Sequence, residues 1–86
     1  MAVFMVERTF PPGITDAERA ANGFRSDKSL FDNPKVTWLR SYYDPVSCRS
    51  LCFYDADSAE SVRKHSEDAR IPCDSVTEVE AIEPGS

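Results

Sequence analysis

The order of hydrophobic periodicities is the feature that most constrains how this chain can fold. Segments with two-residue alternation and segments with a 3.6-residue repeat follow one another as strand, helix, strand, strand, helix, strand over residues 3–83. This order is the split βαβ pair of the ferredoxin-like plan. We therefore predict an α+β fold, a βαββαβ sandwich in which two helices cover one face of a four-stranded antiparallel sheet. The other face of the sheet stays open.

The length favours one domain that associates with itself. We assign residues 1–86 to a single domain, with a core over residues 3–83 and a frayed tail at residues 84–86. A chain this small buries only about 60% of the surface that it exposes when unfolded, so an uncovered sheet face makes the monomer marginal. We therefore expect a homodimer, in the form of a dimeric α/β barrel.

Charge and composition exclude several classes of partner. The chain has 10 Lys and Arg against 15 Asp and Glu, a formal net charge of −5, and no basic cluster. We therefore expect no nucleic acid partner. There is no apolar run of membrane-spanning length and no signal-peptide pattern, so we expect a cytoplasmic protein with no membrane partner. The three cysteines lack CxxC or zinc-finger spacing and are expected to be free thiols.

Local signals place the individual elements. Strands are expected over residues 3–10, 35–43, 48–55 and 76–82. The first helix begins at a capping box from Thr15 to Glu18 and ends at Asn33-Pro34, and the second begins at Asp57 or Ser58 and ends at Ile71-Pro72. The expected buried stripes are Ala17, Ala20, Ala21, Phe24 and Phe31 on the first helix, and Ala59, Val62 and Ala69 on the second.

Strand alternation sorts the side chains of the sheet into two faces. If Tyr43 pairs with Cys48, the face under the helices holds Val36, Trp38, Leu51 and Phe53, together with Phe4 and Val6 of the first strand. The open face then holds Met5, Glu7, Thr9, Thr37, Leu39, Ser41, Tyr43, Cys48, Ser50, Cys52 and Tyr54. For the last strand we favour Val79 and Ala81 inward, which sends Glu78 and Glu80 outward; the alternative puts Val76 and Ile82 inward.

This register gathers Glu7, Cys52, Tyr54 and Glu78 on the open face, across three adjacent strands. Inside a dimer cavity one of the two carboxylates could have a raised pKa and act as a general base or as part of a cation site. The alternative is that both are ordinary solvated strand residues. His65 lies at the edge of the second helix's buried stripe, where it is either a packed residue or a metal ligand that needs further donors from a second subunit.

Several short segments, in this order and spacing, resemble a known family. They are Val6-Glu7-Arg8-Thr9-Phe10, Trp38-Leu39, Ser41-Tyr42, Cys52-Phe53-Tyr54-Asp55-Ala56, Val62-Arg63-Lys64-His65, Ile71-Pro72 and Val76-Thr77-Glu78-Val79. The chain resembles a small bacterial domain family of unknown function that is described as nickel-binding. The resemblance implies a ferredoxin-like fold, a homodimer formed through sheet faces, and nickel binding for sequestration or detoxification.

The same resemblance nominates the metal ligands. His65 matches the helix histidine of the family, and Glu7, Ser41, Cys52 and Glu78 match its recurrent polar positions. One position departs from the pattern, because the histidine that nickel-binding members often carry before the Ser-Tyr pair is Arg40 here. A guanidinium has no lone pair to offer a metal.

Two functions remain open on these observations. The favoured one is a dimer that binds a divalent transition metal, nickel, through His65, Glu7, Cys52 and Glu78, for sequestration or buffering and without turnover. The alternative is a cofactor-independent isomerase, cyclase or monooxygenase with its pocket on the open sheet face. Its general base would be Glu7 or Glu78, Tyr54 or Tyr43 would orient the substrate, and Trp38 would belong to the core. A plain interaction module is a third reading. We expect no organic cofactor.

Overall fold

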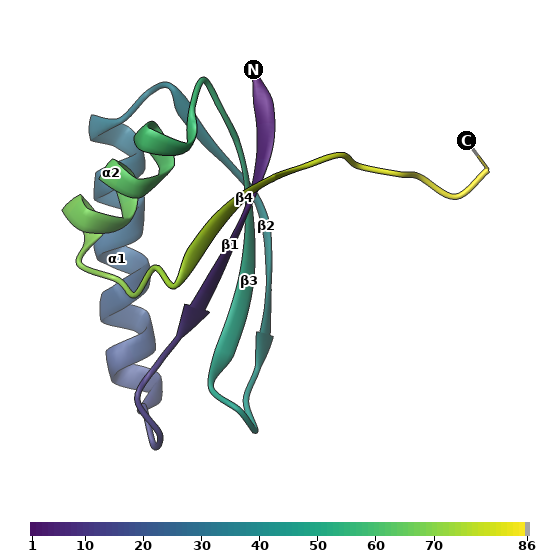
Figure 1. Cartoon of the computed structure of the whole chain (residues 1–86). Coiled ribbons are helices and arrows are strands. Elements are labelled where there is room, and N and C mark those ends of the chain that lie inside the picture. The colour runs from purple at the N-terminus through teal and green to yellow at the C-terminus, as the bar shows by residue number, and fades with distance from the viewer. Residues whose placement is uncertain (86) are drawn as a thin grey trace.

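The structure, a computed structural model, describes residues 1–85 and has the predicted element order (Figure 1). The elements are β1 (Ala2–Thr9), α1 (Asp16–Asp32), β2 (Val36–Asp44), β3 (Arg49–Ala56), α2 (Ala59–Ala69) and β4 (Ser75–Val79). The strands form one antiparallel sheet in the order β2-β3-β1-β4, and both helices lie on the same side of it. The predicted α+β ferredoxin-like fold is confirmed. Of the predicted tail, Ser86 lies outside the described residues.

Both helices begin at capping residues that the sequence predicts. The Thr15 hydroxyl accepts a hydrogen bond from the Glu18 backbone N–H at 3.1 Å and donates one to the Glu18 carboxylate at 3.2 Å. Ser58 accepts from the Ser61 backbone N–H at 3.2 Å at the start of α2. These contacts satisfy backbone donors that the first turn of a helix leaves free. Among the described residues, no helix is long and apolar enough to span a membrane.

The core lies between α2 and the centre of the sheet. Val62 and Ala69 of α2 are fully buried, and Ala59 packs against the core, as the sequence predicts. On the sheet, Phe4 and Val6 of β1 belong to the same hydrophobic cluster as Val62, and both are also buried. The rest of this cluster comes from β2 and β3: Val36, Cys52, Tyr54 and Ala56.

The prediction for α1 is wrong about which side faces inward. Phe24 and Phe31, expected in a buried stripe with Ala17, Ala20 and Ala21, are 76% and 85% exposed. The inward side of α1 is mostly polar: Asn22, Arg25, Ser26 and Ser29 lie on it, followed by the C-cap Asn33, and Leu30 is the one apolar side chain of α1 packed against the core. The reason is that α1 packs mainly on α2 and little on the sheet. Hydrogen bonds from Arg25 Nε to the Ala69 carbonyl at 2.8 Å and from Ser29 to α2 tie the two helices together.

The faces of β3 are the reverse of those predicted. Cys52 pairs with Val6 and Tyr54 with Phe4, so both lie under the helices, and both are buried. Leu51 is 37% exposed on the open face instead. The prediction put the most apolar residues of the hairpin inward, but the helix side of the sheet carries the buried Arg8 of β1, which needs polar neighbours.

A bulge in β2 also changes the predicted hairpin. Tyr43 pairs with Ser50 rather than with Cys48, and Leu39 is passed over, since Trp38 pairs with Tyr54 and Arg40 with Phe53. An extra residue in one strand reverses the direction of every side chain beyond it. Val36 and Trp38 therefore share the helix side with Ser41 and Tyr43.

The last strand is shorter than predicted and turned the other way. Val76 pairs with Val6 and Glu78 with Phe4, which places both on the helix side, while Val79 pairs with Val3 on the open side. Glu80, Ala81 and Ile82 lie beyond the end of β4. After β4 the chain extends away from the body of the protein on the side opposite the helices (Figure 1).

Candidate functional site

The structure separates the residues that the sequence places together. Glu7 lies on the open face, whereas Cys52, Tyr54 and Glu78 lie on the helix side, next to Val6 and Phe4. The predicted pair of carboxylates, Glu7 with Glu78, is therefore split between the two faces of the sheet. The structure gives no geometric basis for a general base whose pKa is raised by the charge of a second carboxylate.

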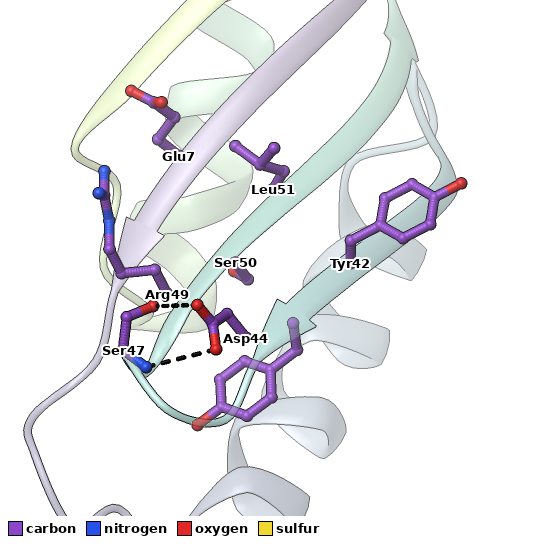
Figure 2. A pocket seen from close by; sticks show the side chains of 8 residues that line it. Glu7, Tyr42, Asp44, Ser47, Arg49, Ser50 and Leu51 are labelled. Atoms are coloured by element: carbon purple, nitrogen blue, oxygen red, sulfur yellow. Dashed lines mark hydrogen bonds between the residues drawn. The ribbon is translucent and has the colours of Figure 1, made fainter.

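Glu7 borders a shallow hollow of about 360 Å³ on the open face, close to the turn between β2 and β3 (Figure 2). Its carboxylate accepts a hydrogen bond from the Ser75 hydroxyl at 2.9 Å. Across the hollow, Ser47 donates to Asp44 at 2.8 Å. Hydrogen bonds from the Ser47 side chain, and then from backbone N–H groups, hold the pKa of Asp44 below its usual value.

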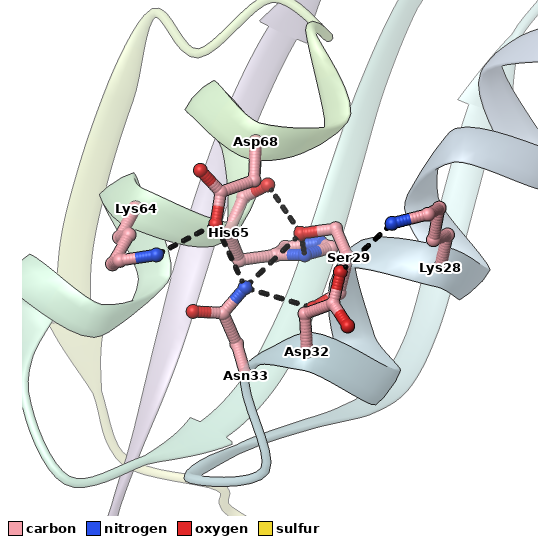
Figure 3. Close-up of polar contacts among 7 residues, drawn as sticks. All are labelled: Lys28, Ser29, Asp32, Asn33, Lys64, His65 and Asp68. Carbon is pink, nitrogen blue, oxygen red and sulfur yellow. Dashed lines mark hydrogen bonds and ion pairs between the residues drawn. The ribbon is translucent and has the colours of Figure 1, made fainter.

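His65 is fully buried between α1 and α2 (Figure 3). The Ser29 hydroxyl donates its one hydrogen to the His65 carbonyl at 2.8 Å, so its oxygen accepts from the imidazole Nδ1–H, also at 2.8 Å. This assigns the tautomer and leaves Nε2 with a lone pair. Nε2 is buried and has no hydrogen-bond partner among the described residues. Burial, and then the nearby charge of Arg8, lowers the pKa of His65 to about 4.

Arg8 is the residue that the sequence argument missed. It is 2% exposed, and its Nη1 donates to Ser66 Oγ at 2.9 Å and to the Pro72 carbonyl at 2.5 Å. Its Nη2 donates to the Tyr54 hydroxyl at 3.0 Å. The alternation of β1 carries the signal that finds it, because Phe4, Val6 and Arg8 are two residues apart and must share a face.

The polar inner side of α1 leaves a cleft of about 390 Å³ between that helix and the sheet. Arg8, Cys52 and Tyr54 line it from the centre of the sheet. Trp38, predicted to belong to the core, is 52% exposed at the same cleft, and its Nε1 donates to Ser41 Oγ at 2.9 Å. Tyr43, predicted on the open face, also lines it, with the Arg19 guanidinium 4.2 Å from the centre of its ring.

The predicted metal ligands do not form a centre within one chain. Over residues 1–85, no group of three or more His, Cys, Asp or Glu side chains is placed to hold an ion. Cys52 lies beside Ser50, at 3.6 Å, and His65 is held by Ser29. The three thiols, Cys48, Cys52 and Cys73, are free, as predicted.

Comparison with known proteins gives one family and one fold relative. A family model described as nickel responsive protein SCO4226-like matches residues 4–79. The crystal structure of SCO4226 from Streptomyces coelicolor A3(2) superposes on this chain with a TM-score of 0.80 at 26% identity. The superposition covers 95% of this chain and 100% of that one. No curated protein sequence matches the chain.

Proposed function

This chain belongs to the family of nickel responsive proteins described as SCO4226-like, and on that premise we propose that it binds nickel as a homodimer that sequesters or buffers the ion. The family match over residues 4–79 is the observation that carries the proposal. It also confirms the family resemblance read from the sequence.

The distribution of donors supports a shared site rather than a site within one chain. Nickel accepts nitrogen, oxygen and sulfur ligands, and a stable site needs several of them at once. One chain does not bring three such side chains together over the described residues. A second copy of the chain would contribute its own metal-ligating side chains where the two surfaces meet.

The open sheet face is the surface that a second copy fits. Tyr42 is 60% exposed and pairs with Leu51, which is 37% exposed, and Phe53 makes an edge-to-face contact with Tyr42. Covering apolar surface of this kind favours association, and part of that gain offsets the loss of translational and rotational freedom. Of the four predicted ligands, Glu7 is the one on this face.

The other predicted ligands fit an ion poorly. Cys52 and His65 are buried, and both lie close to the fixed positive charge of Arg8. A cation beside that guanidinium is repelled, and a metal there would lack the further donors that it needs. We therefore favour Glu7, with its counterpart in the partner chain, over His65 as a nickel ligand.

Arg40 also lies on the open face, where it pairs with Phe53. The resemblance read from the sequence implies that nickel-binding members often have a histidine at this position. The arginine adds a charge that opposes cation binding, and the neighbouring Tyr42 phenol raises the pKa of Arg40 further. Arg40→His replaces a repelling group with a ligand and is expected to increase nickel affinity.

A calorimetric titration of nickel into the metal-stripped protein at pH 7 tests the proposal, with the oligomeric state followed by sedimentation in the same buffer. We expect micromolar or tighter binding at one ion per dimer. Glu7→Gln should weaken it and Arg40→His should strengthen it.

Glu78→Gln serves as the matched control, because it removes the same charge on the other side of the sheet. Absence of binding heat above the dilution background in the wild type contradicts nickel binding. Equal losses in Glu7→Gln and Glu78→Gln contradict the placement on the open face.

A further inference from the structure

The cleft between α1 and the sheet contains a buried charge without a counter-ion. The ion pairs among the described residues join Arg19, Lys28, Lys35 and Lys64 to carboxylates, and none involves Arg8. Arg8 is nevertheless 2% exposed. Buried charges in proteins are normally paired, because leaving water without a partner costs several kcal/mol. A buried arginine without a counter-ion is typical of a site that binds an anionic ligand.

Arg8 also has hydrogen bonds left to give. A guanidinium has five N–H donors, and the three bonds to Ser66, Pro72 and Tyr54 use three of them. The two that remain are the Nε–H, which is buried and has no partner among the described residues, and one hydrogen on Nη2. Two donors on one planar guanidinium match the two oxygens of a carboxylate.

The surroundings of Arg8 keep its charge uncompensated. His65 is neutral at pH 7, since its pKa is lowered to about 4. Tyr54 accepts from Arg8 but carries no negative charge at neutral pH, because burial raises its pKa above the usual value. Asp27 borders the cleft from the exposed side of α1 and forms no ion pair with Arg8.

The walls of the cleft suit the aromatic or apolar part of a small organic molecule that binds beside Arg8. Trp38, Tyr43 and Phe10 supply aromatic surface, and Ser26 of α1 faces them. The volume of about 390 Å³ lies within the range of small-molecule sites. Aromatic walls with few convergent polar groups are what such sites usually have.

We propose that this cleft binds a small organic monocarboxylate with an aromatic or apolar body. The carboxylate accepts from the Arg8 Nε–H and from the free Nη2 hydrogen, and the body lies against Trp38 and Tyr43 under α1. Arg19 and Asp27, which also line the cleft, carry opposite charges, so the buried Arg8 leaves a net charge of one that a monoanion neutralises and a dianion overcharges. The site lies on the opposite side of the sheet from Glu7 and is independent of nickel.

Titration of the ¹⁵N-labelled whole chain with phenylacetate, followed by amide chemical shifts, tests this inference. We expect saturable shifts around Arg8, Cys52 and Ser26. Phenylacetamide, which has the same shape without the charge, should bind at least about tenfold more weakly, because hydrogen bonds to charged groups contribute that much. Inorganic phosphate should give no comparable saturable shift.

Variants locate the site. Arg8→Gln should abolish the preference for phenylacetate over phenylacetamide. Trp38→Ala, at a position exposed enough to tolerate truncation, should weaken phenylacetate binding several-fold, whereas Phe24→Ser on the outer side of α1 should not change it.

Three results would overturn the proposal: equal affinity for acid and amide, shifts centred outside the cleft, or no saturable shift up to about 10 mM phenylacetate. Equal binding of phosphate would overturn the assignment to an organic acid. The comparison of acid with amide uses the wild-type chain, so it holds even if Arg8→Gln does not fold.

Discussion

His65 joins the two helices through a hydrogen bond from its Nδ1–H to the Ser29 hydroxyl, and its imidazole is neutral with the proton on Nδ1. Ser29 accepts from Nδ1 at 2.8 Å and donates to the His65 carbonyl at 2.8 Å, while Asn33 donates to the Asp68 carboxylate at 3.1 Å beside them (Figure 3). Protonation of Nε2 would place a second positive charge next to Arg8. The role of His65 in the single chain is therefore structural.

The stability of the fold should fall as the solution is acidified through the titration of His65. The pKa is about 6.5 when unfolded and about 4 when folded, so the unfolded state binds the proton more readily and stability is lost as the pH decreases from 6.5 toward 4. We expect the free energy of unfolding to decrease by about 2 kcal/mol between pH 7 and pH 5. Urea denaturation at the two pH values measures it.

His65→Asn is the matched control for this titration, because the amide can still donate to Ser29 but does not titrate. Its stability should change little between pH 7 and pH 5, where most carboxylates stay ionised. An equal decrease in the wild type and in His65→Asn would show that other groups are responsible.

Truncation of Ser29 should destabilise the fold by more than the small size of its side chain suggests. Ser29→Ala leaves the buried Nδ1–H of His65 without an acceptor and removes the donor to the His65 carbonyl. An unsatisfied buried polar group costs about 1–3 kcal/mol, so we expect destabilisation in this range by urea denaturation. Ser26→Ala, one turn earlier on the same helix, is the control and should stay within about 0.5 kcal/mol of the wild type.

At the scale of elements, α1 has its apolar side exposed and its polar side inward. Phe24→Ser and Phe31→Ser replace exposed rings with a residue of similar helix propensity. We expect each to change the free energy of unfolding by less than about 0.5 kcal/mol.

Phe4→Ala provides the contrast for these two variants. Phe4 is 4% exposed in the core, and truncation of such a ring costs about 3–5 kcal/mol. If Phe24→Ser or Phe31→Ser costs as much as Phe4→Ala, α1 is turned as the sequence predicts and not as the structure has it.

Element order, capping residues and the α2 stripe could be predicted from the sequence because each depends on neighbours along the chain. Thr15 and Ser58 cap their helices, and Val62 is buried, whatever the rest of the fold does. The orientation of α1 could not be predicted, since it depends on packing against α2 rather than on the apolar repeat of its own sequence.

The candidate site was less predictable for a related reason. The sequence contains no mark of the bulge at Leu39, and one skipped residue moves Ser41 and Tyr43 from the predicted open face to the helix side, while Val36 and Trp38 stay where they were predicted. The inward turn of Cys52 and Tyr54 depends on Arg8, a charged residue that a hydrophobicity argument assigns to solvent. Tyr54 and Arg8 satisfy each other only in the folded sheet.

At the scale of the whole molecule, the proposed homodimer can be tested on the open sheet face. Leu51→Glu places a charge beside Tyr42 and Phe53, and burying that charge in an interface is costly. We expect this variant to sediment as a monomer at concentrations where the wild type is a dimer.

Phe24→Glu is the control for association, because it places the same charge on the outer side of α1. It should leave the dimer intact. A monomeric wild type, or dissociation by Phe24→Glu and not by Leu51→Glu, contradicts association through the sheet.

The attachment of α1 to α2, rather than to the sheet, divides the protein into units of unequal local stability. Amide hydrogens of α1 should exchange with solvent through sub-global opening, while those of β1 and β3 require global unfolding. Such an opening exposes the space beneath the helix and removes only one apolar contact, that of Leu30, from the core. If the cleft binds a small carboxylate as proposed, the population in which α1 is closed would set how fast that molecule enters and leaves.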